Sequence, residues 1–327
     1  MFLESINLYR KLILMSELFS NLENKSILIT GHINPDGDAL GAALSFKIIL
    51  NELGYHADVC FDIKENLPSN LNHLPLDLIT KEAKEHYDKI IVFDCGNPER
   101  LGKLEPLSHS ATEVVVVDHH IDPSFGDIQI IDPTAASTTQ VLFREIKKFN
   151  HQISQDIANC LMTGLITDTG RFQYSNTDSE VFNIAADLMN SGAELTKISE
   201  NIYGSISFNA MKLQSEIIKR IELFTEQSLV VSYVLQEDYK KYNIEESEVD
   251  FLIDSIRLVK ESNIALLLKE QSDNTYKGSL RSRNNINVQL IASIFGGGGH
   301  KAASGFSTTH DVKDVINQVK EAIESQL

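Results

Sequence analysis

Short apolar runs alternate with longer amphipathic stretches through the first part of the chain. Residues 26–30, 89–94, 113–118 and 128–132 are rich in Val, Ile and Leu. Such runs are typical of parallel strands that are covered on both faces, and amphipathic stretches between them, such as 39–53, predict right-handed crossover helices. The pattern therefore predicts an α/β fold whose N-terminal part is a doubly wound, mainly parallel sheet with helices on both faces.

The pattern changes after residue 190. A polar, mixed stretch over 191–208 precedes an expected helix over 210–223. Beyond it, strands are predicted over 228–235, 263–270 and 276–283, and helices over 246–259, 288–295 and 311–325. We therefore expect a first domain over 1–190, a helical linker over 191–225 and a smaller α/β domain over 226–327, with the active site in the cleft between the domains.

Composition and charge limit the kinds of partner and the cellular location that we expect for this protein. The 327 residues carry 46 acidic and 29 basic side chains, a formal net charge of −17. Such a protein has no global field that attracts long polyanions, so we expect no long duplex nucleic acid. Three widely spaced cysteines fit a reducing compartment, and no stretch is apolar enough to span a membrane. Charges interrupt the apolar runs of residues 1–22, which predicts an amphipathic helix rather than a signal peptide. We expect a cytoplasmic protein, and a homodimer is compatible with the sequence.

The segment from His32 to Asp38 concentrates candidate ligands. It reads His-Ile-Asn-Pro-Asp-Gly-Asp, directly after the strand over 26–30 and directly before the helix over 39–53, for which Asp38 is the expected N-cap. Ligands in open α/β sheets bind at the carboxyl ends of strands. The alternative is a polar turn in which Pro35 and Gly37 only make the bend.

Further carboxylates and imidazoles follow other expected strands and a helix. Asp94 ends one strand, Asp118-His119-His120 ends the next, and Asp168 follows the helix over 154–167. Adjacent strand ends lie about 5 Å apart, and carboxylates crowded there repel unless a cation neutralises them. This donor set favours two divalent cations, Mn²⁺ first, with Mg²⁺ or Co²⁺ as alternatives. Taken singly, Asp94 could instead cap a helix, and the triplet could be a polar loop.

A second candidate site lies near the C-terminus. Four glycines precede His300, and Arg281 and Arg283 stand two residues apart in an expected strand. Glycine disfavours ordered structure, so core packing does not explain the run. Bare backbone N–H groups can approach an anion in a nest, and guanidinium groups bind phosphate bidentately. The alternative for the glycines is a flexible hinge.

Together, these motifs resemble those of the DHH phosphoesterase superfamily with its associated C-terminal domain, and within it the NrnA group. The resemblance implies that His32 and Asp36 hold one metal ion, that Asp38, His119 and Asp168 hold the other, and that Asp94 bridges the two. It also implies that Asp118 orients a ligand histidine and that His120 faces the substrate phosphate. The residues implied to bind substrate are Arg281, Arg283, Gly297, Gly298, Gly299 and His300.

The same resemblance implies a Mn²⁺-dependent enzyme. It would hydrolyse short single-stranded oligoribonucleotides to mononucleotides and remove the 3′-phosphate of 3′-phosphoadenosine 5′-phosphate. One alternative is a phosphodiesterase for pApA or cyclic di-AMP, and another is a catalytically idle nucleotide sensor. The complete set of candidate ligands argues against the sensor, whereas nothing in the sequence separates the two enzymatic readings.

Overall fold

The computed structural model describes residues 17–64, 67–120, 125–204, 206–284 and 286–326. The chain forms two compact units, residues 1–205 and 206–327. The amphipathic helix expected at the N-terminus falls largely outside the described residues. The connection expected over 191–225 is divided between the units, because α7 (Leu195–Tyr203) packs in the first core and α8 (Phe208–Lys219) in the second.

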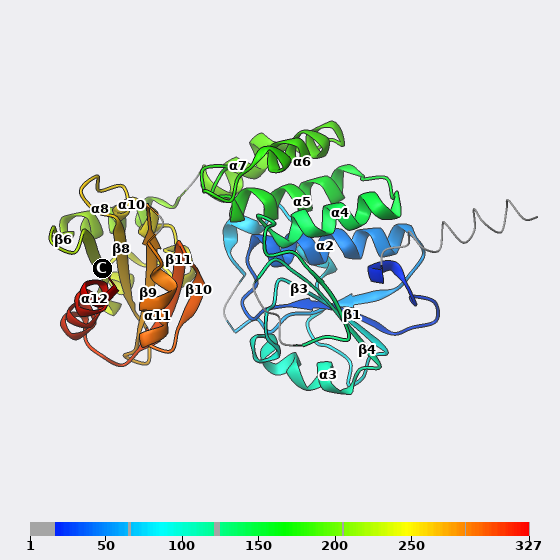
Figure 1. Ribbon diagram of the computed structural model, residues 1–327, viewed down its shortest axis with the longest axis horizontal. Coiled ribbons are helices and arrows are strands. Elements are labelled where there is room, and N and C mark those ends of the chain that lie inside the picture. Colours follow the sequence, from blue (N-terminus) through cyan, green and yellow to red (C-terminus); the bar gives the residue numbers. More distant parts are fainter. Residues whose placement is uncertain (1–16, 65–66, 121–124, 205, 285, 327) are drawn as a thin grey trace, which may run out of the picture. The chain divides into compact units, whose positions relative to one another are not determined.

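The first unit contains a five-stranded sheet of order β2-β1-β3-β4-β5, in which every pairing is parallel. This arrangement confirms the predicted sheet (Figure 1). Its strands are β1 (Ile27–Gly31), β2 (Ala57–Val59), β3 (Lys89–Phe93), β4 (Glu113–Asp118) and β5 (Ile128–Ile131). Its α-helices are α2 (Gly37–Glu52), α3 (Glu105–Ser110), α4 (Thr138–Phe149), α5 (Gln155–Asp168), α6 (Ser179–Asn190) and α7.

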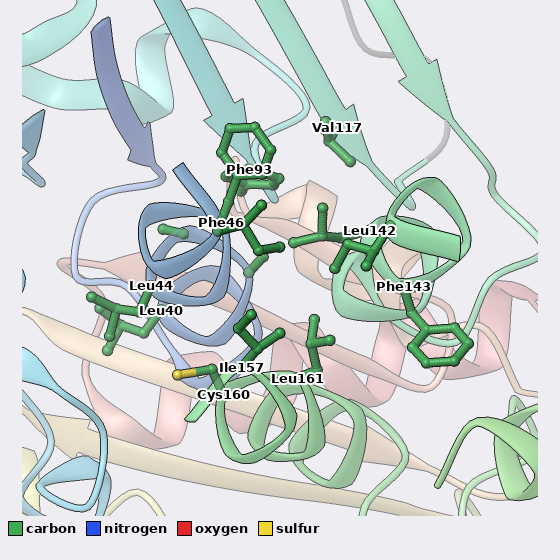
Figure 2. Packing of buried hydrophobic residues seen from close by; sticks show 14 of the residues in the cluster. Leu40, Leu44, Phe46, Phe93, Val117, Leu142, Phe143, Ile157, Cys160 and Leu161 are labelled. Carbon is green, nitrogen blue, oxygen red and sulfur yellow. The ribbon is translucent and has the colours of Figure 1, made fainter. Parts of the chain in front are cut away.

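Both faces of this sheet are covered, which explains the unbroken apolar runs. Alternate residues of the strands point to opposite sides, so Phe93 and Val117 join the large core, whereas Val92 and Val116 join a smaller one. Helices α2, α4 and α5 cover the first side and α3 lies on the other (Figure 1). Figure 2 shows Phe46 of α2 packed below Phe93, with ring centroids 5.6 Å apart. All three cysteines are free thiols in these cores.

Helices α2 and α5 approach each other closely through glycines. A Cβ on Gly41 would lie 2.4 Å from the carbonyl oxygen of Cys160, and one on Gly164 would lie 2.5 Å from Oδ1 of Asp38. No side chain fits at such distances, so glycine is required at both positions. The second contact places the end of α5 against the start of α2, where the candidate ligands lie.

The second unit is built on a six-stranded mixed sheet of order β10-β11-β9-β8-β7-β6, in which only β7 and β8 pair in parallel. One apolar core lies on each side of it. The strands are β6 (Glu222–Phe224), β7 (Leu229–Val234), β8 (Ile264–Glu270), β9 (Tyr276–Ser282), β10 (Gly298–His300) and β11 (Ala303–Thr308). The α-helices are α8, α9 (Gln236–Tyr242), α10 (Leu252–Ile256), α11 (Val288–Ile294) and α12 (Val312–Gln326).

The prediction for this unit is right in its main strands but differs from the structure elsewhere, and it contains neither β6 nor α9. The helix expected over 246–259 is only a 3₁₀ turn at Glu246–Glu248 and the short α10. Strands β10 and β11 were not predicted, because their glycine and serine residues carry little β propensity. β11 is held in an extended conformation by its antiparallel pairing with β9, which the local sequence does not reveal.

Candidate metal centre

The order of the strands brings the predicted ligands to one edge of the first sheet. β1, β3 and β4 are neighbours and run in parallel, so their carboxyl ends lie together. His32 follows β1, Asp94 follows β3, and Asp118 ends β4 with His119 directly after it. The centre is therefore assembled by the sheet, from segments far apart in sequence.

One cluster consists of His32, Asp36 and Asp94. Nε2 of His32 lies 3.8 Å from Oδ1 of Asp36 and 3.5 Å from Oδ2 of Asp94. The Nδ1 atom of His32 lies 2.8 Å from the carbonyl oxygen of Ile33, which fixes the ring with Nε2 toward the carboxylates. Candidate ligand atoms of these three residues lie within 4.8 Å of one another.

Asp36, not Asp38, caps α2, which corrects the expected N-cap. Its Oδ1 accepts hydrogen bonds from the backbone N–H groups of Asp38 and Ala39 at 3.0 and 3.1 Å. Helix α2 begins at Gly37, earlier than the apolar pattern indicates. Asp38 thus lies in the first turn and is wholly buried, which turns its carboxylate into the domain instead of along the helix end.

The second cluster consists of Asp38, His119 and Asp168. Nε2 of His119 lies 3.3 Å from Oδ2 of Asp168 and 4.0 Å from Oδ2 of Asp38. The same nitrogen lies 3.6 Å from Oδ1 of Asp94. Because Oδ2 of Asp94 faces His32 and Oδ1 faces His119, its carboxylate stands between the two clusters; that it bridges two metal ions stays a prediction. Asp94 also has a left-handed backbone with φ of 56°, a conformation that is uncommon for residues other than glycine, although aspartate and asparagine adopt it more readily than most.

The N-terminus of α4 holds Asp38 in place. Backbone N–H groups of Thr138 and Thr139 donate to its two carboxylate oxygens at 2.6 and 2.9 Å, and the Thr139 hydroxyl donates at 2.8 Å. The hydroxyl of Thr138 donates to Oδ1 of Asp94 at 3.1 Å. The sequence analysis did not identify these threonines. Ser137 caps the helix, since its Oγ accepts a hydrogen bond from the N–H of Gln140 at 3.0 Å.

Negative charge in the centre changes the protonation of its histidines. Burial alone would lower the pKa of His32, but hydrogen bonds and charges from Asp36 and Asp94 raise it to about 10. Burial likewise disfavours charged His119, yet Asp168 and Asp94 raise its pKa to about 11. Both rings therefore hold positive charge at neutral pH, which shows how strongly the site favours cations.

Burial and neighbouring charges also shift the pKa values of the aspartates in this centre. Burial, together with Asp168 and Asp94, raises the pKa of Asp38 well above its ordinary value. Burial and neighbouring carboxylates raise the pKa of Asp168 to about 6, although His119 opposes this. Burial also works against charge on Asp94, but His32 and His119 lower its pKa. Carboxylates this crowded require a compensating cation.

Asp118 and His120 stand beside the two clusters. Nδ1 of His120 lies 2.7 Å from Oδ1 of Asp118, which also accepts the backbone N–H groups of His119 and His120 at 2.7 and 3.1 Å. His120 Nδ1 is 3.5 Å from Oδ1 of Asp94. Asp118 therefore orients His120 directly, whereas its link to the candidate ligand His119 is through the backbone.

The donor set and its spacing fit divalent metal ions. A cation bound at roughly 2.0–2.6 Å from each ligand needs donor atoms less than about 5 Å apart, and both clusters meet this condition. Mixed carboxylate and imidazole donors without thiolate suit hard to borderline divalent ions. The centre is thus suited to divalent metal binding.

The predicted arginines of the second unit lie together. Arg281 in β9 and Arg283 just after it line one small pocket, along with Arg257 and Asn263. The Arg283 guanidinium donates to the carbonyl oxygen of Arg257, and Nε of Arg257 lies 3.1 Å from Asp254. Sequence reasoning missed Arg257, which adds a third guanidinium to this pocket.

The glycine run is partly an edge strand. Gly298 pairs with Gly305, and β10 ends the sheet, so one side of its backbone is unpaired by strands. Packing does explain Gly297, contrary to expectation, because a Cβ there would lie 2.5 Å from Cβ of Phe306. Gly299 has φ of 134° and is similarly crowded, whereas a Cβ on Gly298 would meet nothing within 4 Å. His300 contributes its backbone to β10.

Comparisons with known proteins agree with the motifs. Residues 26–165 match the family model described as the DHH family, N-terminal domain, and residues 226–327 match the DHHA1 domain. The bifunctional oligoribonuclease and PAP phosphatase NrnA of Thermus thermophilus is 30% identical over 328 residues, which cover 98% of this chain and 95% of that protein. The protein of the same name from Bacillus subtilis is 25% identical over 86% of this chain and 89% of its own length.

A solved structure shows the same fold over the whole length. An exopolyphosphatase-related protein from Bacteroides fragilis superposes with a TM-score of 0.86 at 23% identity, and the match covers 96% of each chain. Among the described residues, none of the helices is both long and apolar enough to cross a membrane. Motifs, sheet order and relatives thus lead to one conclusion: the chain belongs to the DHH family of phosphoesterases, with a DHH domain in its first unit and a DHHA1 domain in its second.

Proposed function

We propose that this chain is a two-metal phosphoesterase that hydrolyses short oligoribonucleotides to mononucleotides and removes the 3′-phosphate of 3′-phosphoadenosine 5′-phosphate. The observation that carries the proposal is the pair of ligand clusters on either side of Asp94. The names of the Thermus thermophilus and Bacillus subtilis relatives support the choice of substrates. The alternatives, a phosphodiesterase for pApA or cyclic di-AMP and an idle nucleotide sensor, are distinguished by the substrate panel.

Six side chains would hold the metal ions. His32 and Asp36 would bind one ion. Asp38, His119 and Asp168 would bind the other, and Asp94 would bridge the two ions. When bound, two such cations lower the pKa of a water molecule to near neutrality and neutralise the charge that develops on a phosphoryl group. Mn²⁺ is proposed because it accepts both carboxylate and imidazole donors, with Mg²⁺ and Co²⁺ as alternatives.

His120 would contact the substrate phosphate. Asp118 accepts a hydrogen bond from its Nδ1 at 2.7 Å, which fixes the ring and stabilises its protonated form. Burial would lower the pKa of His120, but Asp118 and Asp94 raise it. A protonated imidazole can donate a hydrogen bond to a phosphoryl oxygen as negative charge develops there.

The second unit would bind the part of the substrate remote from the reaction. Arg281 and Arg283 supply guanidinium groups, and the exposed edge of β10 at Gly298 supplies backbone N–H groups to which a phosphate can come close. Binding energy gained there can be used to position the reacting phosphate. The net charge of −17 favours small substrates over long strands.

A substrate panel tests the proposal. Purified protein with Mn²⁺ is given RNA dimers to pentamers, 3′-phosphoadenosine 5′-phosphate, pApA and cyclic di-AMP, and the initial rates are compared. We expect the short RNAs and the bisphosphate to be hydrolysed most efficiently. A strong preference for pApA or cyclic di-AMP would replace the proposed substrate class, and tight binding of nucleotides without any hydrolysis would identify a sensor. The variant Asp94→Asn serves as the inactive control for contaminating nucleases.

A further inference from the structure

Three consecutive residues after Asp168 have a left-handed backbone. Gly170, Arg171 and Phe172 have φ angles of 53°, 63° and 62°. Glycine adopts this conformation readily, but side-chain-bearing residues do so at a cost and normally singly. A run that includes an arginine and a phenylalanine, and that begins two residues after the candidate metal ligand Asp168, stores backbone strain.

Hydrogen bonds hold this strained turn in one conformation. The N–H of Arg171 donates to the carbonyl of Ile166 at 2.9 Å, and the N–H of Phe172 donates to Oγ1 of Thr169 at 3.2 Å. The Thr169 hydroxyl in turn donates to the carbonyl of Leu165 at 2.6 Å. Because these contacts fix the backbone to the end of α5, the direction in which Arg171 leaves the turn is fixed as well.

The Arg171 side chain is held by an aromatic ring instead of a carboxylate. Its guanidinium carbon lies 4.5 Å from the ring centroid of Tyr203, and the Tyr203 hydroxyl donates to the carbonyl of Ile166 at 3.2 Å. Stacked guanidinium groups keep their planar donors for a second partner. Among the described residues, Arg171 forms no ion pair, whereas Arg144 and Arg220 each pair with carboxylates.

We propose that Arg171 binds a phosphate group of the substrate other than the one that reacts. The inference rests on the proposed function and adds a specificity residue to it. Arg171 is only three residues from the candidate ligand Asp168, and among the described residues no ion pair joins the two side chains. Its guanidinium is exposed and is oriented by the ring of Tyr203, so it is suited to bidentate contact with a second phosphate. Substrates with two phosphates would therefore be preferred over those with one.

Paired substrates test this preference. Arg171→Ala should lower kcat/KM for 3′-phosphoadenosine 5′-phosphate by about 10- to 100-fold, the range expected for one lost charged hydrogen-bonding partner. The loss should appear mainly in KM, and Arg171→Lys should recover part of it. For 3′-AMP, which lacks the second phosphate, the change should stay below about threefold. Equal losses on the two nucleotides would overturn the assignment.

The control and a binding measurement separate this inference from the proposed function. Lys197→Ala removes the same charge from α7, the helix that carries Tyr203, at an exposed side chain paired with Glu194, and should leave the ratio of the two substrates unchanged. Calorimetric affinities for the bisphosphate and for 3′-AMP need no turnover. If no nucleotide is hydrolysed but Arg171→Ala still weakens bisphosphate binding selectively, the proposed function fails and this inference stands. The inference is overturned if Arg171→Ala does not selectively weaken binding of the bisphosphate. It is also overturned if the unmodified protein does not bind the bisphosphate.

The strained turn has a test of its own. Arg171→Gly and Arg171→Ala remove the same guanidinium, so they should lose the same affinity for the bisphosphate. Only glycine relieves the left-handed backbone, so Arg171→Gly should melt a few degrees above Arg171→Ala. A melting temperature of Arg171→Ala that equals or exceeds that of Arg171→Gly would show that the turn does not impose strain at this residue.

Discussion

Metal binding by this centre should release protons. In the metal-free protein the carboxylates raise the pKa of His32 to about 10 and that of His119 to about 11. An imidazole must give up a proton to offer Nε2 to a cation, because the protonated ring has no lone pair there. Each bound cation therefore has to displace a proton that the same carboxylates hold in place.

The expected magnitude follows from these two groups. At pH 7 both rings are protonated, so loading the pair of sites should release about two protons. Each site should gain about tenfold in apparent affinity per pH unit between roughly pH 7 and 9, since one proton is exchanged per cation. Asp168, with a pKa raised to about 6, adds little above pH 7 but should increase the number of released protons below that value. Burial and the neighbouring carboxylates also raise the pKa of Asp38, so any proton that it holds adds to the two from the histidines.

Titration calorimetry with Mn²⁺ in buffers of different ionisation enthalpy measures the number of protons that are released when the metal binds. His32→Gln should reduce the count by about one, because it removes one of the two protonated rings. His109→Gln is the matched control, since His109 is exposed and lies 3.6 Å from Glu105 in α3, away from the candidate ligands. A release close to zero at pH 7 in the unmodified protein would refute the reasoning, because it would mean that both rings are neutral before the metal arrives.

Three further results are expected. Asp94→Asn should lower both metal occupancy and kcat while the fold persists. If calorimetry shows that the variant still binds two ions and its turnover is near normal, the bridging role is contradicted. Gly298→Ala should fold normally, because its Cβ has open space, but should weaken nucleotide binding; Gly297→Ala, which meets Phe306, should instead lower the melting temperature. The value of kcat/KM on RNA should fall steeply beyond roughly five nucleotides and recover partly with added salt. Equal rates on dimers and on much longer strands would show that the protein has a basic track that binds long strands.

The sequence was sufficient to predict which segments meet at the candidate metal centre. Apolar runs locate buried strands, and parallel strands place their carboxyl ends on one edge, so His32, Asp94 and His119 could be assigned to one place before the structure was known. The apolar runs carry this information because β1, β3 and β4 are buried along nearly their whole length. The contacts of Asp38 with Thr138 and Thr139 could not be predicted, since they join residues 100 and 101 positions apart and depend on the packing of α4 against α2.

The helix cap shows a second limit of local reasoning. Asp36 and Asp38 are both acceptable N-caps by composition, and the apolar pattern begins at Ala39, which favoured Asp38. The structure selects Asp36 because burial of Asp38 is needed elsewhere: its carboxylate receives three donors from α4. Here a tertiary contact decided between two choices that are equal locally.

The glycines and the left-handed turn illustrate why sequence cannot separate packing from binding. Glycine is compatible with a crowded position, with a positive φ and with close approach of a ligand. Gly297, Gly299 and Gly298 differ in what a Cβ would meet, and of these three Gly299 alone has a positive φ. At Arg171 the reverse holds, because the sequence gives no sign that an arginine occupies a conformation suited to glycine. Other side-chain-bearing residues share a left-handed φ, so the exposed guanidinium stacked on Tyr203, and not the backbone alone, supports the proposed binding role of Arg171.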